Sequence, residues 1–194
     1  MRYPTEHKEQ TRQRIVRAAS RRFRSRGSEG AGIGDLMRDL KLTHGGFYRH
    51  FDTKEDLFVA AFEQALSEVG ERAQKAAATA APGQELKAII DAYLDIEHCD
   101  DVAGGCPVAA LATEIARRPA QARQPFLRAL QTHVMKMQQY VPGANEQERR
   151  RKTAALLSGM AGTLAVARAF PDVEDRRRML EGARQFYLHA VSAS

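Results

Sequence analysis

Apolar residues recur at spacings of three and four along nearly the whole chain, which is the spacing of one face of an α-helix. The widest of these stripes is made of Leu57, Phe58, Ala61, Phe62, Ala65, Leu66 and Val69. Glycine and proline interrupt the pattern at Gly27, Pro82, Gly83, Pro119, Pro142, Gly143 and Pro171. No segment shows the alternation of a convincing strand, and Trp is absent from the 194 residues. We therefore predict an all-α protein of about nine helices.

The ends of several predicted helices carry recognisable caps. A first helix over residues 5–26 stops at Gly27, because glycine adopts the backbone conformation that follows a helix end. Thr43 is a good N-cap for a short helix, and Thr53 with Asp56 forms a capping-box pattern before the next one. The other helices are expected over about residues 33–40, 54–81, 86–94, 107–118, 126–141 and 145–169, with a loop at residues 100–105 and a last helix after Asp172.

The positive charge of the chain is concentrated near its N-terminus. The net charge is +6, and residues 1–54 contain 13 Lys or Arg against 6 Asp or Glu. Residues 55–194 contain 17 bases against 18 acids. Such a field attracts a polyanion, above all nucleic acid or an anionic membrane surface, although a solvated basic helix would have the same composition.

Residues 5–51 have the layout of a helix-turn-helix. The long first helix would support two short helices that are joined by a turn of three to four residues. Side chains in the N-terminal half of the third helix would enter the major groove of DNA. We therefore predict a DNA-binding domain over residues 1–54 and a second, all-helical domain over residues 55–194.

The stretch from Leu42 to Leu57 resembles the DNA-binding signature of TetR-type transcriptional regulators. The matching positions are Thr43, Gly45, Phe47, Tyr48, His50, Phe51, Thr53, Lys54 and Glu55. The resemblance implies a homodimeric regulator, in most cases a repressor, that binds a palindromic double-stranded DNA operator and releases it when a small-molecule inducer binds. It also implies that residues 55–194 form the ligand-binding and dimerisation domain.

Seven residues are the candidate DNA contacts. They are Thr43, His44, Gly46, Tyr48, Arg49, His50 and Lys54. Arg49 is best suited to a bidentate guanine contact, which is worth about 1–3 kcal/mol of discrimination. The hydroxyl, imidazole and ammonium groups of Tyr48, His50 and Lys54 lie where they could reach phosphates. His50 could equally cap or pack inside the domain.

A helix-turn-helix of this size reads one half-site, so useful affinity needs two copies of the chain. Small and apolar residues within 146–191 would allow two helices from each subunit to form a four-helix bundle. The candidate interface residues are Leu157, Ala161, Leu164, Arg168 and Phe186. The same stripe could instead face the core of its own chain.

An inducer needs a pocket in the second half of the chain. Flexible methionine side chains and aromatic rings are suited to lining such a pocket, and nearby polar side chains could orient the ligand. The candidates are Phe62, Leu66, Tyr93, Glu97, His133, Met137 and Met160. Each apolar candidate could equally be a core residue.

Cys106 is the most distinctive residue of the second half. It stands before Pro107, which is favoured at a first helical position, so the dipole of the predicted helix would favour a thiolate. The pattern from His98 through Asp100 to Cys106 resembles a subgroup of TetR-type regulators. That resemblance implies a redox or electrophile sensor, with Cys99 able to act as a resolving partner. The alternative is a small buried residue that fills the helix start.

Other functions find little support in the sequence. It contains none of the patterns of nucleotide-binding loops, serine hydrolases or zinc proteases, so we predict that the chain is not an enzyme. No metal, cofactor or membrane partner is expected, and a cytoplasmic location is the default for a chain with two cysteines and no visible secretory signal. A sequence-neutral DNA-binding protein stays open as an alternative, because the basic first helix and the adjacent glycines at 45 and 46 allow it.

Overall fold

The computed structural model describes residues 3–30 and 32–192. Within these residues the chain forms nine α-helices and two short 3₁₀ helices and contains no strand, so the all-α prediction is confirmed. The elements in chain order are α1 Tyr3–Arg26, α2 Ile33–Asp39, η1 His44–Arg49, α3 Lys54–Thr79, α4 Glu85–Tyr93, α5 Ile96–Asp100, α6 Pro107–Ala116, α7 Ala120–Met137, η2 Gln138–Tyr140, α8 Glu146–Ala167 and α9 Val173–Ser192. None of these described helices is both long enough and apolar enough to cross a membrane.

Local capping explains several of the helix ends. Helix α1 stops at Gly27, which has a φ of 70°, a backbone conformation that favours glycine. Helix α3 begins with the predicted capping box: the Thr53 hydroxyl accepts a hydrogen bond from the Asp56 N–H, and the Asp56 carboxylate accepts one from the Thr53 N–H. The side chain of Asn145 likewise accepts a hydrogen bond from the Glu148 N–H at the start of α8.

Two elements differ from the sequence expectation. The third helix of the predicted helix-turn-helix is a short 3₁₀ helix, His44–Arg49. Its two glycines disfavour an α-helix, and 3₁₀ helices occur in short segments of this kind. The five-residue helix α5 was not predicted, since so short a helix leaves no periodic pattern. It is started by Asp95, whose carboxylate accepts a hydrogen bond from the Glu97 N–H at 2.8 Å.

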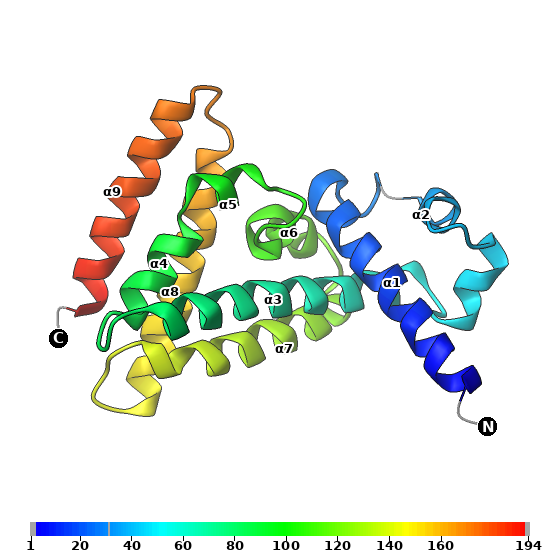
Figure 1. Cartoon of the computed structure of the whole chain (residues 1–194), viewed down its shortest axis with the longest axis horizontal. Helices are drawn as coiled ribbons and strands as arrows, with labels where there is room; N and C mark the ends of the chain where they lie inside the picture. The colour runs from blue at the N-terminus through cyan, green and yellow to red at the C-terminus, as the bar shows by residue number, and fades with distance from the viewer. Residues whose placement is uncertain (1–2, 31, 193–194) are drawn as a thin grey trace.

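The first hydrophobic core joins the N-terminal helices to the rest of the molecule. Its largest members are Phe23, Phe47, Phe58, Phe62 and Phe126, which are each at most 2% exposed. They come from α1, η1, α3 and α7, so this core contains residues from both sides of the domain boundary that we predicted after residue 54. Figure 1 shows α3 running from the N-terminal helices into the second half, with α7 alongside it.

The second core lies at the other end of the molecule, where α8 and α9 pack together (Figure 1). Ile90, Leu94, Met160 and Leu164 are completely buried there and come from α4, its C-cap and α8. The N-terminal part of α6 contributes Cys106 and Val108. Helix α6 therefore lies between the two cores and contacts both, because its Leu111 belongs to the first core.

Candidate functional site

The turn between α2 and η1 is held by backbone contacts. Lys41 has a φ of 58°, and the N–H of Leu42 donates a hydrogen bond to the carbonyl of Met37 at 2.8 Å. Thr43 is the N-cap of η1, as predicted, and its hydroxyl accepts a hydrogen bond from the Gly46 N–H at 3.2 Å. These contacts orient η1 without using the side chains of His44, Tyr48 and Arg49.

The inner face of η1 is anchored by two aromatic rings. Phe47 and Phe51 are buried and stack with their ring centroids 5.7 Å apart. The guanidinium of Arg12 in α1 lies 4.9 Å from the centre of the Phe51 ring. Both phenylalanines are therefore core residues, and they fix which side of η1 faces outward.

The outer face of η1 presents most of the predicted DNA contacts. Thr43, His44, Tyr48 and Arg49 are all exposed, and Tyr48 is 59% exposed. Gly46 was predicted to share this face, but a side chain there would meet the Thr43 hydroxyl at 3.3 Å and the Met37 methyl at 3.7 Å. The small size of Gly46 thus makes room for its own neighbours, and because the residue is partly exposed its contact with DNA stays a prediction.

His50 and Lys54 lie just beyond η1 and are both half-buried. The Nδ1 atom of His50 is buried and has no hydrogen-bond partner within the described chain. Burial, together with the nearby charges of Lys8, Arg12 and Arg49, lowers the pKa of His50. An approaching anion such as a phosphate would oppose these effects and favour the protonated ring.

A cavity of about 310 Å³, here called the apolar cavity, opens among five helices of the second half. Its lining comes from α3, α4, α6 with its N-cap, α7 and α8. The lining residues are Leu66, Val69, Tyr93, Cys106, Val108, Leu127, Leu130, Gln131, His133, Val134, Arg150, Ala154, Leu157 and Ser158. The volume is at the small end of the range for ligand sites, which is roughly 300–1,000 Å³.

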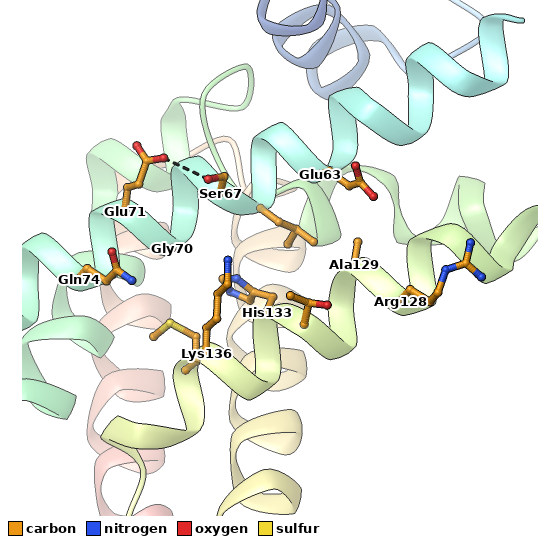
Figure 2. A pocket seen from close by; sticks show the side chains of 12 residues that line it. Glu63, Ser67, Gly70, Glu71, Gln74, Arg128, Ala129, His133 and Lys136 are labelled. Carbon is orange, nitrogen blue, oxygen red and sulfur yellow. Dashed lines mark hydrogen bonds between the residues drawn. The ribbon is translucent and has the colours of Figure 1, made fainter. Parts of the chain in front are cut away.

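A second depression of about 510 Å³, here called the polar groove, lies between α3 and α7 (Figure 2). It is lined by Glu63, Leu66, Ser67, Gly70, Glu71, Gln74, Arg128, Ala129, Thr132, His133, Lys136 and Met137. Figure 2 shows His133 and Lys136 extending from α7 towards α3, while Glu71 points away from α7 and accepts a hydrogen bond from Ser67. Leu66 and His133 line both depressions and so form part of the wall between them.

Four of the seven predicted pocket residues line a depression. Leu66, Tyr93 and His133 line the apolar cavity, and Met137 lines the polar groove. The other three predictions need correction. Phe62 packs edge-on against Phe126 in the first core, Met160 is completely buried in the second core, and Glu97 is exposed on α5 away from both depressions.

Sequence reasoning missed most of the α7 and α8 lining. Leu127, Leu130 and Val134 follow the helical spacing that we recognised, but spacing alone does not distinguish a cavity wall from a core contact. Arg150 and Ala154 are one helical turn apart near the start of α8. Nothing in the local sequence indicates that these residues face α7.

Cys106 and Cys99 are both free, buried thiols in different surroundings. Cys106 is the N-cap of α6, is 3% exposed and lines the apolar cavity next to Tyr93. Cys99 is completely buried in the second core and does not line the cavity, and burial raises the pKa of its thiol. Burial, and then the contact with Cys106, raises the pKa of Tyr93 well above its usual value.

A buried arginine ties α1 to the loop before α6. The guanidinium of Arg24, which has no exposed side-chain surface, donates to the Gly105 carbonyl at 2.8 Å and to the Glu68 carboxylate at 2.8 Å. Its Nε atom also donates to the Ser20 carbonyl at 3.2 Å. Gly105 directly precedes Cys106, so one peptide unit separates this contact from the wall of the apolar cavity.

The other end of α6 is attached to α1 and α3 by a polar cluster. The Glu114 carboxylate accepts hydrogen bonds from the N–H and hydroxyl of Ser28, and Arg118 binds Glu114, Ser28 and Glu55. Burial alone would raise the pKa of Glu114, but the hydrogen bonds from Ser28 and Arg118 outweigh it and hold the pKa low. Helix α6 is therefore fastened to the N-terminal helices at both ends.

The predicted dimer residues occupy different surroundings from those we expected. Ala161 and Leu164 are buried in the chain's own second core, and Leu157 lines the apolar cavity. Arg168 donates to the carbonyls of Cys99 and His98. Ala161 and Leu164 are therefore closed to a partner, which corrects the prediction for these two, whereas Leu157 and Arg168 are partly exposed and their place in an interface stays a prediction. Phe186 is 66% exposed and is the most exposed of the five.

Comparisons with known proteins cover both halves of the chain. Residues 15–61 match the family model for bacterial regulatory proteins of the tetR family, and residues 82–186 match that for the tetracyclin repressor-like C-terminal domain. The transcriptional regulator AcrR of Shigella flexneri is 35% identical over 63 residues, which are 32% of this chain and 29% of that regulator. This likeness therefore spans less than a third of either protein.

Solved structures of the same fold extend over nearly the whole chain. A TetR transcriptional regulator from Chloroflexus aurantiacus has a TM-score of 0.73 at 23% identity and covers 97% of this chain and 98% of its own. FadR from Bacillus subtilis, solved in complex with stearoyl-CoA, has a TM-score of 0.69 at 14% identity and covers 94% of this chain and 98% of its own. Because one family model alone matches more than half of the residues, the chain belongs to the TetR family of bacterial regulatory proteins.

Proposed function

We propose that the protein is a homodimeric transcriptional repressor that binds a palindromic operator and releases it when a small molecule enters the apolar cavity. The observation that carries this proposal is the contact between Arg24 of α1 and the Gly105 carbonyl, beside the cavity residue Cys106. It links the helix that supports η1 to the wall of a ligand-sized cavity. Residues 1–54 are the proposed DNA-binding domain, and residues 55–194 are the proposed ligand-binding and dimerisation domain.

The outer face of η1 supports a role in reading DNA. Arg49 and His44 are exposed beside the cap residue Thr43, where they can reach base edges in a major groove. Tyr48, His50 and Lys54 can reach phosphates on either side and so position the domain on the duplex. The positive charge of residues 1–54 favours the encounter with DNA.

Occupation of the cavity can be transmitted to η1 through α6. A ligand that displaces Cys106 displaces Gly105, and the buried Arg24 guanidinium passes that movement to α1. At the other end of α6, Glu114 and Arg118 couple the helix to Ser28 and Glu55. The dimer can bind DNA when its two recognition segments lie about 34–36 Å apart. A ligand that binds a different dimer geometry more tightly lowers DNA affinity by the ratio of its affinities for the two geometries.

The outer faces of α8 and α9 are the proposed dimer contact. Phe186 is 66% exposed and Val166 is 49% exposed, and Gly162 has open space around it. Replacing Phe186 with Glu is expected to shift the protein from dimer to monomer in sedimentation velocity, because it places a charge in an apolar contact. The exposed neighbour Gln185 replaced with Glu is the matched control. If the Phe186→Glu variant stays as dimeric as the Gln185→Glu control, this placement of the interface is contradicted.

Selection of bound DNA from a random library tests the function directly. At about 150 mM salt we expect one palindromic consensus, with two half-sites a helical turn apart. If no sequence is enriched, and the affinity for DNA only falls as the salt concentration rises, the chain is instead a sequence-neutral DNA-binding protein.

A thiol sensor is the second candidate function, because Cys106 lines the cavity. Addition of its thiol to a quinone would form one C–S bond and pass the thiol proton to the quinone, which becomes a hydroquinone thioether. At 3% exposure the sulfur is reachable only by a molecule that enters the cavity. Unchanged operator release by quinone, hypochlorite and diamide in a Cys106→Ser variant would exclude this candidate.

A further inference from the structure

We propose that the apolar cavity binds small apolar molecules that carry a carboxylate, and that Arg150 selects this charge. The inference deepens the proposed function, since it rests on the apolar cavity being the effector site. It concerns the class of ligand, which can be measured without DNA. Three features of the lining carry it: the absence of acidic side chains, the neutrality of His133 and Tyr93, and the position of Arg150.

The interior of the cavity is apolar and uncharged. Leu66, Val69, Tyr93 and Cys106 are buried and form its inner wall, so a ligand's hydrocarbon part would be removed from water there. None of the fourteen lining residues is Asp or Glu. An ammonium group in this cavity would lack a counter-charge, and burying an unpaired charge is costly.

Two titratable groups of the lining, His133 and Tyr93, stay neutral near pH 7. Burial, and then the charge of Lys136, lowers the pKa of His133, which favours the uncharged ring. Burial raises the pKa of Tyr93, which therefore keeps its proton. Arg150 is the one Lys or Arg among the fourteen lining residues, and an arginine stays protonated.

The guanidinium of Arg150 is free to bind a ligand. Arg150 is exposed, and within the described residues it forms no ion pair and no hydrogen bond. The nearby Glu148 is paired with Lys152, and Arg149 donates to the Gly143 carbonyl. Leu127, Gln131 and Ser158 are also exposed lining residues, so Arg150 belongs to the solvent-facing side of the cavity. A planar guanidinium there matches a carboxylate through two parallel hydrogen bonds.

The polar groove would not make the same selection. It presents Glu63 and Glu71 from α3 together with Arg128 and Lys136 from α7, so an anion would meet charges of both signs (Figure 2). The apolar cavity also limits size. Its 310 Å³ equals the liquid volume of about ten water molecules, at about 30 Å³ each, which suits a medium-chain or single-ring acid.

Three probes with the same chain and different head groups test the proposal. Octanoate, octanol and octylamine are titrated into the full chain by calorimetry in the absence of DNA. We expect octanoate to bind about tenfold or more tightly than octylamine, with octanol between them, because a charge-assisted hydrogen bond favours the anion. High salt should narrow the difference, since Arg150 is exposed.

The Arg150→Gln variant should bind octanoate no better than octanol and should bind octanol as the unchanged protein does. The control is Arg151→Gln, which removes the same charge from an exposed neighbour that does not line the cavity and should keep the preference. Equal binding of all three probes, preference for the amine, or no binding of octanoate would overturn the proposal. Operator binding by the unchanged protein is measured in parallel without any probe. Absence of this binding would count against the proposed function and not against the ligand class.

Discussion

The DNA-facing segment and the apolar cavity are built in opposite ways. The candidate DNA contacts all lie between residues 43 and 54, and Thr43, Tyr48 and Arg49 point outward from a short segment that is held by its caps and by Phe47. The cavity lining is drawn from five helices between residues 66 and 158. Val69, Tyr93 and Cys106 of its inner wall also belong to the second core, and Leu66 belongs to the first.

Because of this difference, substitutions in the two regions should change different quantities: DNA affinity in one and the free energy of unfolding in the other. An outward side chain of η1 contributes little to the folded state, so its replacement should change DNA binding alone. A buried residue around the cavity holds two or more helices together, so its replacement should change the free energy of unfolding first. Arg24 lies between the two regions and contacts both α1 and the loop before α6.

The largest effect is expected from Arg24→Met. The substitution leaves the Gly105 carbonyl and the Glu68 carboxylate without their buried partner. We expect the free energy of unfolding to fall by about 3–5 kcal/mol in urea titrations, because the buried carbonyls of Ser20 and Gly105 and the partly exposed Glu68 carboxylate all lose their partner. Where the variant stays folded, a cavity ligand should no longer weaken operator binding.

Arg17→Met is the matched control for this prediction. Arg17 is an exposed arginine on the same helix, and its loss should change the free energy of unfolding by less than about 1 kcal/mol. Equal stability of the two variants would show that the two regions are not joined through Arg24.

The second prediction concerns the pH dependence of stability in the cavity half. His98 is buried against Tyr93, whose carbonyl lies 2.6 Å from Nδ1, and burial is the main cause that lowers the pKa of His98 to about 4. The unfolded chain binds a proton near pH 6.5, so it takes up protons before the folded chain does. Stability is therefore complete above pH 6.5 and is lost as the pH falls towards 4.

The His98→Gln variant isolates this effect, because an amide can still donate to the Tyr93 carbonyl but does not titrate. Between pH 7 and pH 4 the unchanged protein should lose about 3 kcal/mol more unfolding free energy than the variant. Urea titrations at a series of pH values measure both curves. Parallel curves would mean that His98 is protonated equally in the folded and unfolded chains.

The same contrast explains what the sequence could predict. The caps at Thr43 and Thr53 depend on neighbours within three residues, so they could be predicted and were found. The position of Gly46 near Met37 of α2 could not be predicted, because it depends on how α2 and η1 pack together. Local pattern determines the face of a helix but not which other helix packs against it.

The errors in the second half have this same origin. Phe62 and Met160 have the residue types of a pocket, and Ala161 and Leu164 have those of a close helix contact. All four are buried in the chain's own cores, because the packing of α3 on α7 and of α8 on α9 decides what each face meets. Arg150 gave no sequence signal, since only the approach of α7 places it at a cavity.

The third prediction returns to η1, where stability should be unaffected. Arg49→Ala should cost about 1–3 kcal/mol of binding to the selected operator and relax the base preference at one position of each half-site. Urea titrations should show the unfolding free energy unchanged within about 0.5 kcal/mol, because the side chain is exposed. Equal loss of affinity for selected and random DNA would assign Arg49 to phosphate contact.

The smallest effect is expected from Lys54→Ala, and it distinguishes positioning from reading within the same segment. Lys54 begins α3, next to the cap Thr53, so its ammonium adds a charge to the DNA-facing side without depending on base sequence. Its removal should weaken binding to all sequences alike and lower the slope of log affinity against log salt by about one unit, because one fewer counterion is released. The measurement is a salt series with the selected operator and with random DNA. A change in base preference, with an unchanged slope of log affinity against log salt, would show that Lys54 contacts bases. Lys54 would then read the sequence, as proposed for Arg49, and would not position the domain on the phosphates.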